Sequence, residues 1–113
     1  GKLRHELPYE RNPRSTAFVP PTEGRQYYAG GFQGGATPFY LGACADMAYN
    51  IEVDERRGIT AAWHDESHWN TYLIRHKPRS LPPEYCWGEP AGPNPNVKIL
   101  ALDKHHASYR NDQ

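Results

Sequence analysis

Acidic and imidazole side chains are concentrated in one short segment, residues 63–68, which reads Trp-His-Asp-Glu-Ser-His. We expect Asp65 to cap a helix, which places Asp65 and Glu66 where the partial positive charge of a helix N-terminus stabilises an anion and fixes its direction. The indole of Trp63 offers a flat apolar surface that suits the C–H face of a sugar ring. A charged helix start with a capping Asp and a core Trp would give the same pattern, so both interpretations stay open at this point.

The two histidines of this segment suggest a different chemistry. His64 and His68 lie four residues apart and could share a helix face as zinc ligands. A metalloprotease helix carries Glu directly after the first His, whereas Asp65 has that position here. Glu66 would lie about 200° around the helix from His64, away from any metal, and no third ligand follows in the next turns. A zinc-dependent hydrolase is therefore kept only as the less favoured alternative.

A glycine-rich run, Tyr27–Gly35, could cradle a ligand through its backbone or form only a tight turn before a helix. It lacks the glycine order of a dinucleotide fingerprint and the Lys-Ser/Thr of a P-loop. Lys104 and Arg110 lie six residues apart in a polar tail. Two such cations could clamp a diphosphate, or could simply be solvated.

Two helices are expected to position these residues. Apolar spacings of one, three and four predict a helix over residues 37–57 that ends at Gly58 and buries one face. That face consists of Phe39, Tyr40, Ala43, Cys44, Met47 and Ile51. A second helix is expected over residues 65–76. Its inner side carries Trp69, Tyr72 and Leu73.

Short strands and loops make up the rest of the predicted chain. The expected strands are residues 17–19, 27–28, 59–63 and 97–102, the last being the clearest. Residues 80–96 hold five prolines and two glycines, which predicts a structured loop.

Composition narrows the function classes. The chain has 113 residues with 13 Lys+Arg against 13 Asp+Glu, so it lacks the strong positive field expected of a nucleic-acid-binding protein. No apolar run approaches the roughly 20 residues of a membrane span, and no signal-peptide pattern follows Gly1. Cys44 and Cys86 make no disulfide framework. Ten glycines, eleven prolines and a hydrophobic fraction of 37% leave little material for a core, so we expect the chain to be part of a larger domain.

Taken in order, these blocks resemble glycosyltransferase family 6, which includes the ABO blood-group transferases, the α-1,3-galactosyltransferases and bacterial relatives. The resemblance extends from Tyr9 to Asn111. The matching blocks are Tyr9-Glu10-Arg11-Asn12-Pro13, Ser15 and Ala17, Glu23-Gly24, the Tyr27–Gly35 run, residues 63–68 with Asn70, Tyr72 and Leu73, His76-Lys77-Pro78, Pro83-Glu84-Tyr85-Cys86-Trp87, and the spacing of Lys104 and Arg110. Several blocks in the same order are far more specific than any one of them.

The resemblance implies an α/β protein with a GT-A fold and the biosynthesis of a glycan. The implied reaction is retaining transfer of N-acetylgalactosamine or galactose from its UDP sugar, in α-1,3 linkage, to a galactose-terminated glycan, which is fucosylated for the ABO-like members. Glu66 matches the proposed catalytic carboxylate of the family. Its role would be that of a nucleophile, or of a stabiliser of an oxocarbenium-like transition state.

The resemblance also assigns binding roles. His64 and Asp65 match positions that hold the donor sugar, and Trp63 matches a residue that packs on the acceptor, which Glu66 would also contact. Positions that tune the choice of sugar are matched by Ala29, which also borders the acceptor, and by Gly31, with Gly30 between them in the donor site. Because glycine at position 31 leaves room for an N-acetyl group, N-acetylgalactosamine is the favoured donor. The residues that close over the diphosphate are matched by Lys104 and Arg110.

Two departures from the family pattern matter. Gly88 stands where ABO-like members carry an acceptor-contacting Asp, which bears on the fucosylated acceptor. The first half of the family's catalytic domain, with its uridine-binding strands and metal motif, has no counterpart here, so residues 1–113 resemble the C-terminal half alone. Mn²⁺ would be the cofactor if that half carries Asp-x-Asp, and no metal if it carries Asn-x-Asn.

The chain is accordingly expected to be a fragment of such an enzyme rather than a truncated product. A non-catalytic sugar-binding remnant that keeps Trp63 and Trp87 is the alternative. Animal relatives are Golgi membrane proteins with an N-terminal anchor, whereas bacterial ones are cytoplasmic or membrane-associated, so the compartment stays open.

Overall fold

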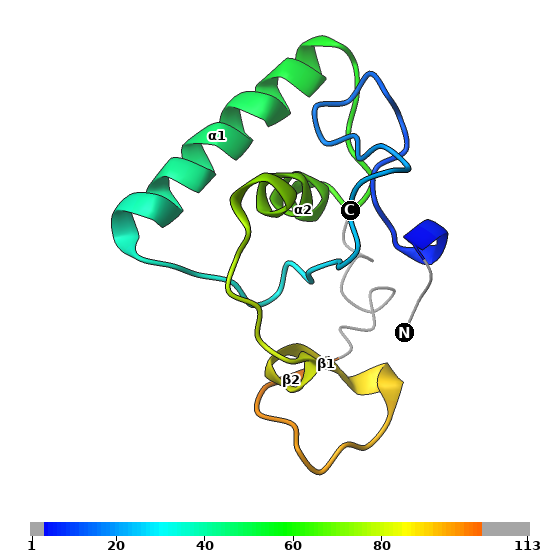
Figure 1. Cartoon of the computed structure of the whole chain (residues 1–113), viewed down its shortest axis with the longest axis vertical. Coiled ribbons are helices and arrows are strands. Elements are labelled where there is room, and N and C mark those ends of the chain that lie inside the picture. The colour runs from blue at the N-terminus through cyan, green and yellow to red at the C-terminus, as the bar shows by residue number, and fades with distance from the viewer. Residues whose placement is uncertain (1–3, 103–113) are drawn as a thin grey trace, which may run out of the picture. The chain divides into compact units, whose positions relative to one another are not determined.

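The computed structural model describes residues 4–102, and the chain divides after Pro78 into two compact units (Figure 1). The first unit contains a short 3-10 helix, Arg4–Glu6, and two α-helices, α1 (Thr37–Arg56) and α2 (Asp65–His76). The second contains two short strands, β1 (Trp87–Gly88) and β2 (Leu100–Ala101). The described elements are therefore α/β, in agreement with the predicted class.

Helix α1 confirms the predicted helix almost residue for residue. Pro38 lies in its first turn, where no backbone N–H is needed for the helix ladder. The helix ends at Arg56, and Gly58 takes a left-handed φ of +71° just beyond it. The buried face is narrower than predicted: Ala43 is buried, whereas Phe39 is 77% exposed and Ile51 is also exposed.

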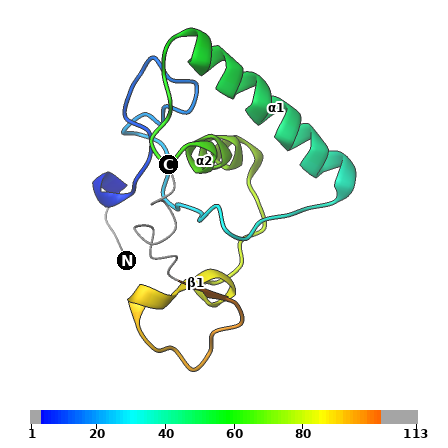
Figure 2. The same cartoon turned by 180° about the vertical axis from the view of Figure 1, so that it is seen from behind.

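Helix α2 packs against α1 through a small apolar cluster, formed by Ala43, Trp69 and Leu73, and both views show the two helices side by side (Figure 2). Tyr72 stacks on Trp69 with ring centroids 5.9 Å apart. The predicted inner side of α2 is thus confirmed. The prediction that Asp65 caps this helix is wrong, because His64 has the cap position and Asp65 is the first helical residue.

Backbone between the helices is turn rather than strand. Residues 62–64 form a turn, so the strand predicted at 59–63 is absent. The backbone groups of Ala62 are satisfied by side chains: its N–H donates to Glu10 Oε2 at 2.5 Å, and its carbonyl accepts from the Ser67 hydroxyl. Because both groups have partners, this segment needs no neighbouring strand.

The other predicted strands are also shorter or absent. Residues 27–28 are irregular, and residues 17–19 contribute only an isolated parallel bridge between Glu10 and Phe18. In the second unit β1 and β2 pair in parallel, Trp87 with Leu100 and Gly88 with Ala101, so the strand predicted at 97–102 is only two residues long.

The loop predicted at residues 80–96 carries two 3-10 helices, Pro83–Cys86 and Glu89–Ala91. The Trp87 indole N–H donates to the carbonyl of Gly92 at 2.8 Å, which ties the loop to β1. Both cysteines are free. Within residues 4–102, no helix combines the length and the apolar character needed to cross a bilayer.

Candidate active site

The Glu66 carboxylate lies at the second position of α2, half-buried, and both of its oxygens are hydrogen-bonded. Oε1 accepts from the Tyr27 hydroxyl at 2.5 Å. Oε2 accepts from the backbone N–H of Gly30 at 2.7 Å. The structure therefore brings the glycine-rich segment and the predicted catalytic carboxylate together, although 36 residues separate Gly30 from Glu66.

Asn70 fastens the same segment to α2 one turn further along the helix. This buried amide accepts from the Tyr28 N–H at 2.7 Å and donates to the Tyr28 carbonyl at 2.8 Å. Its amide also donates to the carbonyl of Glu66 at 2.9 Å. One side chain thus satisfies both backbone groups of Tyr28, which explains why residues 27–28 need no strand partner.

The Tyr27 hydroxyl is held in its protonated, donating form. Burial raises the pKa of Tyr27 above its ordinary value, and the hydrogen bond to Glu66 and the negative charge of that carboxylate raise it further. The ring lies edge-on to Tyr9, with centroids 5.3 Å apart. The sequence patterns predicted no contact of Tyr27 with Glu66 or of Asn70 with Tyr28, because a local pattern cannot indicate a contact between residues about 40 positions apart.

Trp63, His64 and Asp65 are all exposed beside Glu66. Trp63 is 64% exposed, so it is not part of the core of the first unit. Trp63 and His64 both have left-handed backbone, with φ of +59° and +53°. Bulky residues rarely adopt this conformation, and such outliers cluster at functional sites.

The other predicted donor-site residues are placed as follows. Ala29 and Gly31 are exposed on either side of the half-buried Gly30. Lys104 and Arg110 lie outside the described residues.

A second carboxylate, Asp54 of α1, is fully buried and joins α1 to the N-terminal segment. Its oxygens accept from the Ser15 hydroxyl at 2.5 Å and from the Thr16 N–H and hydroxyl, both at 2.7 Å. Burial alone would raise the pKa of Asp54, but these hydrogen bonds outweigh it and hold the pKa below its usual value. We call this group the Asp54 cluster: Asp54, Ser15, Thr16 and His68.

His68 completes the Asp54 cluster, with Nε2 3.7 Å from Asp54 Oδ2. Burial lowers the pKa of His68, although the negative charges of Asp54, Glu10 and Asp65 oppose the shift. His68 is buried while His64 is exposed, so the two predicted zinc ligands do not face a common site. Over residues 4–102, no group of three or more His, Cys, Asp or Glu side chains is arranged to hold a metal.

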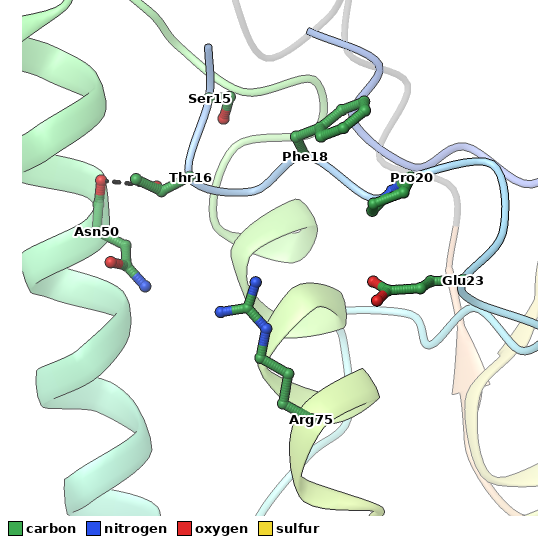
Figure 3. A pocket seen from close by; sticks show the side chains of 7 residues that line it. All are labelled: Ser15, Thr16, Phe18, Pro20, Glu23, Asn50 and Arg75. Atoms are coloured by element: carbon green, nitrogen blue, oxygen red, sulfur yellow. Dashed lines mark hydrogen bonds between the residues drawn. The ribbon is translucent and has the colours of Figure 1, made fainter. Parts of the chain in front are cut away.

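The first unit also contains an open pocket of about 380 Å³ (Figure 3). The N-terminal segment, Asn50 of α1 and Arg75 of α2 line it, and the Thr16 hydroxyl oxygen lies 3.0 Å from the Asn50 carbonyl oxygen and shares its proton between that oxygen and the closer Asp54 carboxylate. Its lining residues are Ser15, Thr16, Phe18, Pro20, Glu23, Asn50 and Arg75. None of the predicted site residues is among them, so this pocket is separate from the group around Glu66.

A half-buried carboxylate fixed beside a glycine turn and an exposed indole is an arrangement suited to carbohydrate chemistry, and comparison with known proteins identifies the class. The chain belongs to glycosyltransferase family 6, whose sequence profile matches residues 2–111. The resemblance predicted from the ordered blocks is thereby confirmed.

Similar proteins come from animals and bacteria. The histo-blood group ABO system transferase 1 of Rattus norvegicus is 40% identical over 113 residues, which cover 96% of this chain and 32% of the relative. The human globoside alpha-1,3-N-acetylgalactosaminyltransferase 1 is 38% identical over 111 residues, which cover 95% of this chain and 32% of the relative. The O-antigen biosynthesis glycosyltransferase WbnI of Escherichia coli is 31% identical over 102 residues, covering 90% and 44%. The chain therefore spans about a third of the animal relatives' length.

Proposed function

We propose that residues 1–113 are the catalytic and acceptor-binding portion of a retaining glycosyltransferase with a GT-A fold. The reaction is transfer of N-acetylgalactosamine or galactose from a UDP sugar, in α-1,3 linkage, to a galactose-terminated glycan. Family membership and the activities for which the relatives are named support the reaction class. The observation that carries the proposal is the Glu66 carboxylate, hydrogen-bonded at both oxygens and still partly exposed, three residues from the exposed Trp63.

In this proposal Glu66 acts at the anomeric carbon of the donor sugar. As a nucleophile, a carboxylate oxygen forms a bond to that carbon while the bond to the UDP oxygen breaks. The acceptor hydroxyl oxygen then bonds to the anomeric carbon and displaces the carboxylate, its proton passing to the departing UDP phosphate, and the two inversions give net retention. As a stabiliser, the same carboxylate faces the positive charge of an oxocarbenium-like transition state. Tyr27 and Gly30 fix the carboxylate in either case, which reduces the reorganisation needed at the reacting carbon.

The neighbouring residues supply binding. His64 and Asp65 hold the donor sugar, and the exposed indole of Trp63 packs on the acceptor. Lys104 and Arg110, outside the described residues, would neutralise the diphosphate as it leaves. Metal dependence would follow from a motif that is not in this sequence, since it contains no Asp-x-Asp.

Substitution of Glu66 tests the reaction. In the full-length protein, Glu66→Gln should lower transfer by roughly 10³-fold because the anion at the reacting carbon is lost. UDP binding, measured by calorimetry, should survive. Glu55→Gln is the matched control, because Glu55 is an exposed glutamate of α1 that takes no part in the site. Full transfer activity in Glu66→Gln would end the assignment.

The donor sugar is tested at position 31. We propose N-acetylgalactosamine because the glycine there leaves space for the N-acetyl group. Gly31→Ala should lower the ratio of N-acetylgalactosamine to galactose transfer, measured by competition between the two UDP sugars, whereas Gly34→Ala should leave it unchanged. An unchanged ratio in Gly31→Ala would refute this donor.

A non-catalytic sugar-binding remnant is the second candidate. The 64% exposure of Trp63 favours it, because an open indole can stack on a sugar without any catalysis. Calorimetry with UDP and with a galactoside separates the two. Binding of the galactoside without UDP supports the remnant, and binding of UDP supports the transferase.

A further inference from the structure

Of the two hydrogen bonds to the Glu66 carboxylate, the one from the Tyr27 hydroxyl is the only one donated by a side chain. We propose that Tyr27 is a positioning residue for the Glu66 carboxylate, and that Tyr9 holds Tyr27 in place; the inference rests on the function proposed above. The hydroxyl donates to Glu66 Oε1 at 2.5 Å across 39 residues of sequence. In this scheme Tyr27 contacts the Glu66 carboxylate and neither the donor sugar nor the acceptor.

Two donors on two different oxygens fix the plane of a carboxylate, whereas one donor leaves it free to pivot. Gly30 holds only Oε2, at 2.7 Å, and Tyr27 holds only Oε1. Loss of the Tyr27 hydroxyl would therefore let the carboxylate turn about its remaining hydrogen bond. A misplacement of about 1 Å at a reacting group can lower a rate by as much as ~100-fold, which makes this orientation matter for the chemistry.

Tyr9 packs edge-on against the Tyr27 ring. It is 3% exposed and meets Tyr27 edge-on at an interplanar angle of 65°. Its hydroxyl donates to the carbonyl of Gln26, the residue before Tyr27, at 2.8 Å. Gly24 permits this packing, because its φ is +78° and a Cβ there would lie 2.8 Å from the Tyr9 ring. The N-terminal segment thus reaches the carboxylate through two aromatic rings.

The decisive variant is Tyr27→Phe in the full-length protein, which removes the hydroxyl and keeps the ring. We expect kcat to fall about 10- to 100-fold, the effect of losing one hydrogen bond to a charged group. The KM values for donor and acceptor should stay within about twofold, because ground-state binding does not use this contact. Tyr49→Phe is the matched control, since Tyr49 is an exposed tyrosine of α1.

Two further measurements separate positioning from packing. Burial and the Glu66 carboxylate together raise the pKa of Tyr27, so in Glu66→Gln the ring NMR signals of Tyr27 should titrate at a lower pH than in the wild type, because the negative charge that opposes ionisation of the hydroxyl is gone. Tyr9→Leu should lower kcat less than Tyr27→Phe does, again with little change in KM.

The outcomes are distinct. An unchanged kcat in Tyr27→Phe, together with loss of transfer in Glu66→Gln, overturns the positioning role and leaves the proposed function standing. Full transfer in Glu66→Gln overturns the proposed function itself. If transfer by Tyr27→Phe falls only in proportion to the folded fraction seen by circular dichroism, Tyr27 serves packing alone and the inference is wrong.

Discussion

Two carboxylates of the first unit are held in the same way but differ in access. Asp54 and Glu66 each accept hydrogen bonds from a hydroxyl and a backbone N–H of the N-terminal 30 residues. Asp54 is 1% exposed, whereas Glu66 is half-buried. The same types of donor therefore serve two purposes, three on Asp54 and two on Glu66: the buried, closed carboxylate joins segments of the fold, and the partly exposed, open one remains able to meet a ligand.

The difference between the two carboxylates is tested most directly by neutralising each of them in turn. Asp54→Asn should lower the free energy of unfolding by about 3 kcal/mol, because buried donors of Ser15 and Thr16 lose an anionic acceptor. Glu66→Gln should change it by less than about 1 kcal/mol, since its site is partly solvated. Urea denaturation of the full-length protein measures both.

Asp46→Asn, an exposed position of α1, is the control for the loss of one charge. Equal destabilisation by Asp54→Asn and Glu66→Gln would show that access does not distinguish the two carboxylates.

A smaller effect is expected from crowding the open carboxylate. A Cβ at Gly30 would lie 3.2 Å from Glu66 Oε2, close enough to displace this flexible side chain by a few tenths of an ångström. Gly30→Ala should lower kcat about tenfold while the thermal midpoint changes little, because the backbone N–H is kept. Gly34→Ala is the matched control, since a Cβ there would meet nothing within 4 Å. Wild-type kcat in Gly30→Ala would contradict the tight fit.

The smallest predicted effect concerns the closed carboxylate and pH. Burial lowers the pKa of His68, so the unfolded chain binds more protons once the pH falls below about 6.5. The contribution of His68 to stability is therefore complete above that pH and is lost as the pH falls. The lowered pKa of Asp54 acts in the same direction at pH values below about 3.8.

We expect stability to fall as the pH is lowered from 7 to 5.5, seen as a falling thermal midpoint. His68→Gln should flatten this dependence, while His64→Gln, at an exposed position, should retain it. A midpoint that stays constant over this range in the wild type would contradict the role of His68.

Local patterns were sufficient for the two helices, but not for the contacts that surround them. Apolar periodicity predicted α1 and α2 within a residue or two, because their cores repeat every three or four positions. The strand predicted at 59–63 is absent, and within it the Ala62 N–H donates to Glu10, 52 residues away, rather than to a neighbouring strand. The same limit hid Tyr27 and Asn70, whose partners are 39 and 42 residues distant. Side-chain to backbone pairing over such separations leaves no periodic signal.

The Asn70 amide has a consequence for evolution as well as for folding. The Asn70 amide is hydrogen-bonded to both backbone groups of Tyr28 and to the Glu66 carbonyl. The glycine-rich segment and the start of α2 should therefore move together. Under the proposed reaction, the side chains at positions 29 and 31 could then change size, and so change the preferred sugar, without altering the reach of the nucleophile. New sugar preferences could then arise by single substitutions at positions 29 and 31 while the geometry of the Glu66 carboxylate stays the same.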